Sequence, residues 1–352
     1  MGVEKITVDI FLAFSQHHPV IDVRSEGEYT HAHIPGAHNL PLFNDEERKV
    51  VGTIYKQQSR EAAIKKGLVY FGPKMNQMIS FIEEIKTNSE DKIVLVHCWR
   101  GGMRSGGVAW LLDLYGFKVY TLVGGYKEFR NWTLKQFEKD WNFNILGGYT
   151  GSGKTITLDS LKQKGEAVID LEGLAGHKGS AFGRIGLPPQ DSVEMFENKL
   201  AVELYQSSEK QKGKNIWLED ESQRIGSVSI PHMLWNTIRK KNIYFLDIPF
   251  EKRLDYLVET YGKLDKIELG DAIKRIEKKL GGLETKTAID FLESDIIKDC
   301  FSILLNYYDK LYKKSLEKRE NLAEILQEIK SDTTDKKMNA ELIINFIHDR
   351  KN

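Results

Sequence analysis

The chain has 352 residues, of which 41% are hydrophobic and 29% are charged, a composition typical of a soluble protein with two or three globular domains. Its 51 basic and 51 acidic residues cancel, which excludes a chain-wide field for binding polyanions, so a nucleic-acid surface has to be a local patch. Two cysteines exclude a disulfide framework, and no signal peptide or membrane-length apolar run is present, which favours a cytoplasmic protein with no membrane partner.

The first 135 residues alternate strand and helix patterns. Ser25, with Glu28 three residues later, has the pattern of a capping box that opens a short helix. Because strands that alternate with helices form parallel sheets, we expect a site at the carboxyl ends of the strands. The strand patterns cover Pro19–Val23, Ile93–Val96 and Lys118–Leu122, and a helical pattern covers Gln77–Lys86.

Cys98 follows the second of these strands, at the start of a short glycine-containing loop. Gly101-Gly102 makes a tight turn, and an apolar helix pattern opens near Ser105. A loop whose N–H groups point inward, with a helix N-terminus behind it, binds anions and favours a thiolate. Arg100 and Arg104 add positive charge beside it. The pattern therefore predicts that Cys98 is a catalytic nucleophile, with Arg100 and Arg104 in catalytic roles.

Four segments of this region resemble a rhodanese domain, over roughly residues 5–135. They are Asp22-Val-Arg with Glu28-Tyr29, His33-Ile-Pro-Gly-Ala, Asn39-Leu-Pro, and the Cys98 loop. The resemblance implies that Cys98 carries sulfur or selenium as a persulfide or selenosulfide. A competing hypothesis remains open, because His97-Cys-x-x-Gly-x-x-Arg104-Ser105 also fits cysteine-dependent phosphatases, in which such a loop holds a phosphate.

A second glycine-rich loop follows a short apolar strand that begins at Phe143, and it precedes a helix pattern. This context is the one that a phosphate loop requires. Its glycines let backbone N–H groups approach phosphate oxygens, Lys154 supplies a cation, and Thr155 is a candidate ligand for Mg²⁺. We expect it to bind a diphosphate or triphosphate. The predicted binding residues are Gly148, Tyr149, Thr150, Gly151, Ser152, Gly153, Lys154 and Thr155.

Three more strand patterns end in acidic residues, as expected where a sheet meets a phosphate site with Mg²⁺. They are Ala167–Asp170, Asn215–Glu219 and Asn242–Asp247. Asp170 and Glu219-Asp220-Glu221 are candidates for metal or water contacts, although plain strand-end carboxylates explain them equally well. The segment from His177 through Lys178, Gly179 and Ser180 to Gly183 is a candidate second anion loop, with a surface turn as the alternative.

From Phe250 onward the pattern is helical. The expected helices there are Phe250–Tyr261, Lys263–Leu280, Lys286–Asp299, Cys300–Leu316, Asn321–Ser331 and Asn339–His348. One further helix, Tyr126–Asp140, is expected before the phosphate loop. In nucleotide kinases a helical region at this place acts as a lid, and Arg253 is a candidate to reach the phosphates. Cys300 lies on an apolar helix face and is interpreted as core. The predicted architecture is a rhodanese-like parallel-sheet domain (1–135), a phosphate-loop α/β domain (136–250), and a helical lid with C-terminal helices (251–352).

A rhodanese domain followed by a phosphate-loop domain resembles the tRNA 2-selenouridine synthase family. His177-x-Gly-Ser-x-Phe-Gly183 and Glu219-x-Glu-Ser-x-x-Ile-Gly226 are similar to further motifs of that family. The resemblance implies an enzyme acting on wobble 2-thiouridine in the tRNAs for Lys, Glu and Gln. It also implies two co-substrates: geranyl diphosphate, which alkylates the sulfur, and selenophosphate, whose selenium replaces the geranylthio group by way of Cys98. Trp99 is a candidate to stack on the uracil, with packing against the loop as the alternative.

Two other classes of function remain open from the sequence. One is a cysteine-dependent phosphatase fused to a small-molecule kinase, and the other is a regulatory module whose phosphate loop binds ATP or GTP as a switch. An RNA surface has only weak support, because basic clusters are usually solvated helix faces. The clusters are Lys49, Lys56, Arg60, Lys65 and Lys66; Arg239, Lys240 and Lys241; Lys274, Arg275, Lys278 and Lys279; and Lys310, Lys313, Lys314, Lys318 and Arg319.

Overall fold

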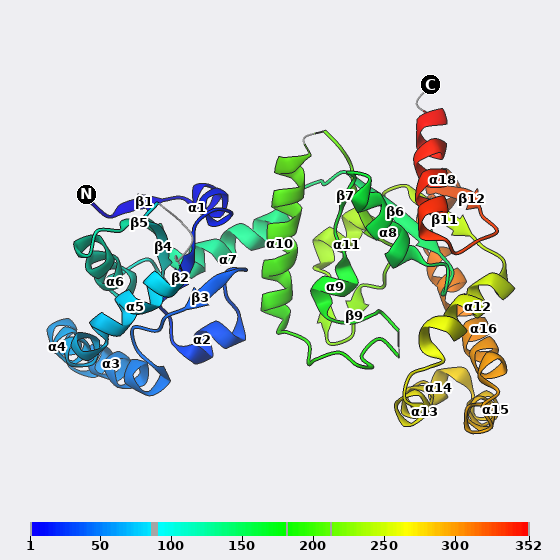
Figure 1. The fold of residues 1–352 in the computed structure, drawn as a ribbon, viewed down its shortest axis with the longest axis horizontal. Coiled ribbons are helices and arrows are strands. Elements are labelled where there is room, and N and C mark those ends of the chain that lie inside the picture. Colours follow the sequence, from blue (N-terminus) through cyan, green and yellow to red (C-terminus); the bar gives the residue numbers. More distant parts are fainter. Residues whose placement is uncertain (1, 86–90, 181, 212, 351–352) are drawn as a thin grey trace. The chain divides into compact units, whose positions relative to one another are not determined.

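A computed structural model describes residues 2–85, 91–180, 182–211 and 213–350, which form two compact units (Figure 1). The first unit comprises Met1–Gln136 together with Glu194–Val202, and the second comprises Phe137–Val193 and Glu203–Asn352. Each unit contains a five-stranded sheet in which all strands are parallel. The predicted fold class, two α/β domains followed by a helical region, is therefore confirmed.

The sheet of the first unit has the strand order β1-β5-β4-β2-β3. Strand β4 (Ile93–His97) is central, and four of its five residues are buried because helices cover a parallel sheet on both faces. Its carboxyl end carries Cys98 into the hydrophobic core. The other elements are β1 (Glu4–Ile6), α1 (Val8–Ser15), β2 (Val20–Asp22), α2 (Glu26–His31), β3 (Ala37–Asn39), α3 (Asp45–Gln57), α4 (Arg60–Phe71), η1 (Gly72–Lys74), α5 (Met75–Ile85), α6 (Met103–Leu114), β5 (Lys118–Leu122) and α7 (Gly125–Gln136).

The sheet of the second unit has the order β12-β11-β6-β8-β7, with the phosphate loop at the carboxyl end of its central strand β6 (Phe143–Gly148). The helical region has a core of its own, which includes Cys300. The remaining elements are α8 (Lys154–Gln163), β7 (Ala167–Val168), α9 (Leu171–Ala175), α10 (Val193–Lys210), β8 (Ile216–Glu219), β9 (Arg224–Ile225), β10 (Val228–Ser229), α11 (His232–Arg239), β11 (Ile243–Asp247), α12 (Phe250–Tyr261), α13 (Lys266–Arg275), α14 (Glu277–Leu280), α15 (Gly282–Glu293), α16 (Ile297–Leu316), α17 (Leu322–Ile325), β12 (Leu326–Lys330) and α18 (Lys336–Asp349).

The prediction of an all-helical segment after residue 250 is wrong in one place. The expected helix Asn321–Ser331 is a single turn, α17, followed by strand β12. Leu326 and Ile329 are spaced as on a helix, but the segment gains a full parallel ladder by pairing with the edge of β11. Tertiary hydrogen bonding thus overrides the local pattern.

Other boundaries also differ from the predictions. Helix α7 ends at Gln136 rather than Asp140, because the chain turns there and buries Phe137 and Trp141. The segment Lys263–Leu280 is two helices, α13 and α14, and the predicted Lys286–Asp299 is α15 followed by the start of α16. Lys86, the last residue of the predicted Gln77–Lys86 helix, lies outside the described residues. Among the described residues no helix is long and apolar enough to cross a membrane.

Candidate functional site

The Cys98 loop runs from the end of β4 to Gly102, which precedes the first turn of α6. Two backbone hydrogen bonds from the start of α7 hold this loop in place. Tyr126 N–H donates to the Cys98 carbonyl oxygen at 2.8 Å, and Lys127 N–H donates to the Trp99 carbonyl oxygen at 2.9 Å. Gly125, at φ +61°, touches the loop so closely that a Cβ there would collide with its backbone. The loop therefore has a fixed shape, which depends on the absence of a side chain at Gly125.

The Cys98 sulfur lies among neutral hydrogen-bond donors. The Ser105 hydroxyl is 3.2 Å from Sγ, and Gly102 N–H donates to Sγ at 3.4 Å. Burial raises the pKa of the thiol, but hydrogen bonds from the Ser105 side chain and from the backbone of Ser105, Gly102 and Arg100 lower it further, so the net shift is downward. The environment favours a thiolate, as a nucleophile requires.

The two arginines next to this loop do not hold the sulfur as expected. Arg104 donates to Glu28 at 2.8 Å, and Arg48 reaches the same carboxylate at 2.8 Å. Burial opposes ionisation of Glu28, but Arg104 and Arg48 lower its pKa overall. Arg100 is exposed and forms no ion pair within the part of the chain that the structure describes. The predicted attraction between Arg104 and the thiolate is thus replaced by hydrogen bonds from Ser105 and the loop backbone.

A buried polar cluster supports the loop from the sheet. Arg24 forms a bidentate pair with Asp22, at 2.6 Å for the shorter contact, and its guanidinium lies 3.8 Å from the centre of the Tyr126 ring. Burial is the main cause that lowers the pKa of His97, to about 4, so this side chain is neutral at pH 7. Trp99 is 38% exposed, and its ring is tilted against Tyr126 at 5.7 Å between centroids.

Sequence reasoning missed the part of α10 that belongs to this unit. Tyr126 Oη donates to Glu194 Oε1 at 2.7 Å, and the Asn198 amide donates to Tyr126 Oη at 2.8 Å and to the His33 carbonyl oxygen at 2.9 Å. Asn198 is fully buried. These contacts hold the Tyr126 side chain in place next to the Cys98 loop, to which its backbone N–H also donates. No motif announces them, since Glu194 and Asn198 lie some 70 residues further along the chain.

The phosphate loop of the second unit has left-handed backbone at Gly151 (φ +79°) and Gly153 (φ +72°), so side chains are disfavoured at both positions. Gly153 directly precedes α8, and the loop therefore ends at a helix N-terminus, where backbone N–H groups favour anions. Lys154 Nζ donates to the Gly148 carbonyl oxygen at 3.0 Å and lies 3.5 Å from Glu219.

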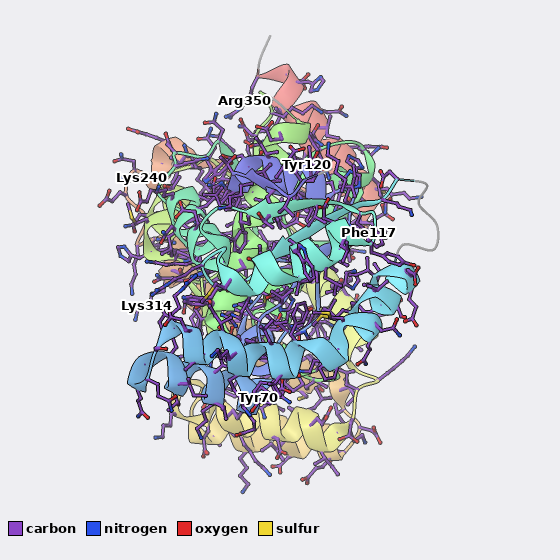
Figure 2. The ribbon with its side chains drawn as sticks, turned by 90° about the vertical axis from the view of Figure 1, so that its left-hand side faces the viewer. Tyr70, Phe117, Tyr120, Lys240, Lys314 and Arg350 are labelled. Atoms are coloured by element: carbon purple, nitrogen blue, oxygen red, sulfur yellow. The ribbon has the colours of Figure 1, made fainter. Side chains whose placement is uncertain are left out.

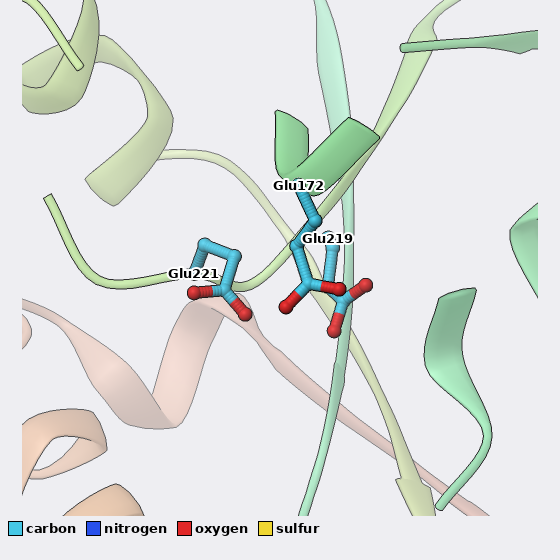
Figure 3. A group of neighbouring side chains, drawn as sticks. All are labelled: Glu172, Glu219 and Glu221. Atoms are coloured by element: carbon cyan, nitrogen blue, oxygen red, sulfur yellow. The ribbon is translucent and has the colours of Figure 1, made fainter. Parts of the chain in front are cut away.

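Three glutamates converge beside Lys154 and Thr155. Figure 3 shows Glu172, Glu219 and Glu221 with their carboxylates pointing toward one another, and one oxygen from each lies within 4.8 Å of the others. Thr155 Oγ1 donates to Glu219 at 2.9 Å. Burial first, and mutual repulsion second, raise the pKa of Glu172 to about 9 and that of Glu221 to about 8. Glu172 was absent from the predicted site residues, because α9 follows β7 with no motif that singles it out.

These groups line a cavity of about 410 Å³ that also has many aromatic and aliphatic lining residues. Its polar lining includes Lys154, Thr155, the three glutamates and the Lys178–Ser180 segment. Its aromatic and aliphatic lining comes from α12, α16 and the loop after α9, and comprises Phe182, Tyr256, Leu257, Tyr261, Phe301, Leu304, Leu305, Tyr308, Leu311, Tyr312 and Leu316. A site with this lining suits an amphiphilic ligand that has an anionic head and a hydrocarbon tail.

Several predicted residues have other roles. Asp170 caps α9 by accepting from Gly173 N–H at 2.9 Å. Arg253 is buried and donates to the Thr150 carbonyl oxygen at 2.9 Å and to Asp309 at 2.8 Å, so it supports the phosphate loop instead of reaching into it as a lid residue would. Cys300 is core as predicted, and burial raises the pKa of its thiol to about 11.

The candidate second anion loop contributes to the cavity in part. Lys178, Gly179 and Ser180 line it, and Lys178 Nζ lies 5.6 Å from the centre of the Tyr261 ring. Burial and the charge of Arg184 lower the pKa of His177, which is not among the lining residues. Ala181, within the same motif, lies outside the described residues.

Buried polar contacts of Tyr312 join α16 to the phosphate loop, and no sequence motif predicts them. Tyr312 Oη accepts from Gly148 N–H at 3.3 Å and donates to Asp220 at 2.7 Å. Arg319, whose side chain is fully buried, pairs with the other oxygen of Asp220. The phosphate loop, the acidic segment after β8 and the end of α16 are therefore held together by polar side chains.

Comparison with known proteins gives consistent matches to both units. The family model of the tRNA 2-selenouridine synthase AAA domain matches residues 141–339, and that of the rhodanese-like domain matches residues 10–131. A tRNA 2-selenouridine synthase of Sulfurovum sp. (strain NBC37-1) is 34% identical over 335 residues, which cover 85% of this chain and 89% of the relative. One from Shewanella denitrificans (strain OS217) is 36% identical over 342 residues, covering 87% and 90%.

Among solved structures, the N-terminal domain of a protein from Clostridium difficile 630, described as ATP/GTP binding, is 41% identical to this chain. The match has a TM-score of 0.34 and covers 37% of this chain and 99% of that one.

Proposed function

This chain belongs to the tRNA 2-selenouridine synthase family, and from that premise we propose that it exchanges sulfur for selenium at wobble 2-thiouridine in the tRNAs for Lys, Glu and Gln. The reaction has two steps, one at each of the sites described above. Geranyl diphosphate first alkylates the thiocarbonyl sulfur, and selenium from selenophosphate, delivered by way of Cys98, then replaces the geranylthio group. The observation that carries this proposal is a cavity lined both by the phosphate loop and by many aromatic and aliphatic side chains.

In the first step the thiocarbonyl sulfur attacks C1 of geranyl diphosphate, a C–S bond forms, and diphosphate leaves with the electron pair of the broken C–O bond. Negative charge builds on the departing oxygen. Lys154 and the phosphate-loop N–H groups, which line the cavity or begin α8, would stabilise that charge. Leu304 and Leu305, on α16, would contact the hydrocarbon chain. An alkylated sulfur is afterwards a better leaving group than a thiocarbonyl sulfur.

The acidic residues of this cavity fit a divalent cation. Carboxylate and hydroxyl oxygens are the ligands that Mg²⁺ prefers, and Glu172, Glu219, Glu221 and Thr155 supply them within a small volume. Bound there, Mg²⁺ would supply positive charge for the diphosphate. Lys154 would then be released from its contact with Glu219 and be free to donate to the diphosphate itself.

In the second step selenium reaches C2 of the pyrimidine and geranylthiol leaves. The lowered pKa of the Cys98 thiol supports its role as a nucleophile in handling selenophosphate. Trp99 is exposed next to it, and aromatic side chains commonly stack on RNA bases that leave the helical stack. Packing of Trp99 against the Tyr126 ring is the alternative explanation of its position. Comparing Trp99→Phe with Trp99→Ala would distinguish stacking on the uracil from packing.

For the tRNA we propose a basic surface that joins α11 and α16, here called the α11/α16 ridge. Residues 310–319 contain five basic side chains and one acidic, Glu317. Arg239 donates to the Ser315 carbonyl oxygen at 3.1 Å, which brings two basic clusters together although 70 residues separate them in sequence. Lys240 and Lys314 project outward along the same edge in Figure 2. The ridge comprises Arg239, Lys240, Lys310, Lys313, Lys314 and Lys318.

The ridge residues Lys240, Lys310, Lys313, Lys314 and Lys318 are exposed, and none forms an ion pair with another described residue. Most residues of the other basic clusters share these properties, and what favours the ridge is its nearness to the cavity. Ser315 and Leu316, next to Lys314 on α16, line the cavity. A phosphate backbone bound along the ridge would therefore bring a base close to the diphosphate site.

A matched pair of variants tests the ridge. Lys313→Glu with Lys314→Glu should weaken tRNA binding about tenfold or more and reduce the salt dependence by roughly two phosphate contacts. Lys278→Glu with Lys279→Glu, on exposed α14, makes the same change of net charge and serves as the control. Equal effects of the two double variants would mean that the ridge has no special part in binding.

The proposed activity is tested with the purified chain, tRNA containing 2-thiouridine, geranyl diphosphate, selenophosphate and Mg²⁺. Nucleoside chromatography with mass detection should show S-geranyl-2-thiouridine first and 2-selenouridine after it. ATP and GTP, offered in place of geranyl diphosphate, should support no modification. Tight binding of ATP or GTP without binding of geranyl diphosphate would contradict the proposal and favour a nucleotide switch or kinase.

A further inference from the structure

The Cys98 loop has the dimensions of a phosphoryl-transfer site. Five residues separate Cys98 from Arg104, and Ser105 follows directly. Building on the proposed function, we propose that the Cys98 thiolate attacks the phosphorus of selenophosphate and accepts its phosphoryl group, so that selenium leaves as hydrogen selenide. Cys98 then carries phosphate, not selenium, between the two halves of the second step. The selenide ion itself replaces the geranylthio group.

Electron counting favours this route. Selenium has the same formal oxidation state, −2, in selenophosphate and in the C=Se group of the product. A selenosulfide on Cys98 would require two electrons to be removed from sulfur and selenium and later returned, and neither the structure nor the proposed reaction supplies an oxidant. Phosphoryl transfer changes no oxidation state, so it needs no additional reagent.

The bonds balance at each stage. The S–P bond forms as the P–Se bond breaks, and selenium leaves with the electron pair and takes a proton as HSe⁻. Water then attacks phosphorus and releases phosphate and the thiolate. HSe⁻ adds to C2 of the S-geranylated base, its proton passes to N3, and geranylthiolate leaves. The products are 2-selenouridine, phosphate and geranylthiol.

The side chains around the sulfur suit both parts of phosphoryl transfer. The Ser105 hydroxyl donates to the Gly102 carbonyl oxygen at 3.1 Å and lies 3.2 Å from Sγ, so a rotation about its C–O bond would let it donate to sulfur when the thiolate departs from phosphorus. It is fully buried, so water does not compete for it. A leaving thiolate requires such a donor. A selenosulfide route would also release a thiolate, but it would not require a pocket for phosphate.

The rim of the loop has the charge that a phosphate group needs. Arg48 and Arg104 both pair with the single carboxylate of Glu28, so these three side chains have a net charge of +1. Arg100 adds a second positive charge. Met103 begins α6 there, so the first N–H groups of a 12-residue helix add to the field at the same place. The net field favours a phosphate dianion, which carries more charge than a selenide.

The test uses selenophosphate under argon with the full chain carrying Cys300→Ala, which leaves Cys98 as the single thiol. After rapid denaturation, peptide mapping by exact mass should find a phosphoryl group on Cys98 and free selenide in solution. Selenium, recognised by its isotope pattern, on Cys98 without a phosphoryl group would overturn the inference. So would efficient selenation of S-geranylated tRNA with no adduct of either kind.

Ser105→Ala sharpens the result. Without the hydroxyl the thiolate leaves phosphorus more slowly, and the phosphoryl adduct should persist roughly tenfold longer or more. The two proposals fail separately. Selenated tRNA without a phosphoryl adduct refutes the inference and leaves the proposed function standing, whereas a phosphoryl adduct in a chain that makes no 2-selenouridine refutes the proposed function alone.

Discussion

Both candidate sites have backbone N–H groups suited to an anion, but the side chains around them differ in charge. Around Cys98 the stabilising groups are neutral donors, namely the Ser105 hydroxyl and backbone N–H groups, and Arg104 is already paired with Glu28. Around Lys154 the loop N–H groups face three glutamates, and Lys154 itself contacts Glu219.

This difference implies different requirements for activity. The Cys98 loop is already arranged for negative charge before any substrate binds, because its shape is fixed by α7 and Gly125. The phosphate-loop cavity instead contains an internal contact between Lys154 and Glu219, which the proposed diphosphate and cation would have to displace. Preorganised donors give catalysis without rearrangement, while a site that must rearrange depends on its ligands and on pH.

The largest effect is expected at the preorganised site. Cys98→Ala removes the nucleophile and should lower selenation by about three orders of magnitude or more, because no neighbouring group replaces a missing nucleophile. Geranylation should continue, since it needs no enzyme thiol, so S-geranyl-2-thiouridine should accumulate. Nucleoside chromatography measures both products. A folded variant that forms no S-geranyl nucleoside would show that the two sites do not divide the reaction in this way.

At the other site Lys154→Ala should reverse this outcome. Losing one charged donor at a developing oxyanion costs about 10²–10³ in rate, and this loss should fall on geranylation. Selenation of tRNA that already carries the S-geranyl group should proceed near the wild-type rate. Parallel assays with the two tRNA substrates decide it. Wild-type geranylation by this variant would assign the phosphate loop to another ligand.

The sequence was sufficient for the fold of both units and for the two loops, because each loop is a local strand–loop–helix pattern. Cys98 directly follows strand β4, and Lys154 and Thr155 begin helix α8 after the loop that follows strand β6, as predicted. Helices α3 and α4 were not anticipated, since much of their surface is exposed and the apolar residues of α4 are not gathered on one face. Strand β12 was missed because parallel pairing with β11 depends on a partner some 80 residues away.

The partners of the site residues could not be read from the sequence at all. Arg104 was expected at the sulfur and instead pairs with Glu28, 76 residues earlier in the chain. Arg253 was expected at the phosphates and instead pairs with Asp309. Charge type and position predict that an arginine lies near an anion, but several carboxylates compete for it, and only the fold decides which one is nearest.

Alkylation of the thiols tests the claim that neutral donors govern Cys98. At pH 7 iodoacetamide should label Cys98 well before Cys300, whose pKa is raised to about 11 by burial. Ser105→Ala should raise the pKa of the Cys98 thiol and slow labelling several-fold to about tenfold, the effect of losing a hydrogen bond to a charged group. Arg104→Ala should have a smaller effect, because its guanidinium contacts Glu28. A pH–rate profile with peptide mapping distinguishes these outcomes, and a larger effect of Arg104→Ala would return the arginine to the thiolate.

The smallest effect concerns the pH dependence of stability at the carboxylate cluster. Glu172 and Glu221 ionise near 4.5 in the unfolded chain but at about 9 and about 8 in the folded one, so the folded protein binds more protons across this range. Stability from these groups is present below pH 4.5 and declines as pH rises through about 8 to 9.

Glu221→Gln stays neutral throughout, and its unfolding temperature at pH 8.5 should exceed that of wild type by at least about 2–4 °C, with little difference at pH 5. Mg²⁺ should stabilise the wild type more than this variant at the higher pH, because the cation binds the ionised carboxylate. Thermal unfolding at both pH values, with and without Mg²⁺, measures all four conditions. Parallel pH profiles for the two proteins would show that Glu221 is ionised in the folded state at neutral pH, and the contrast between the two sites would then lose its electrostatic basis.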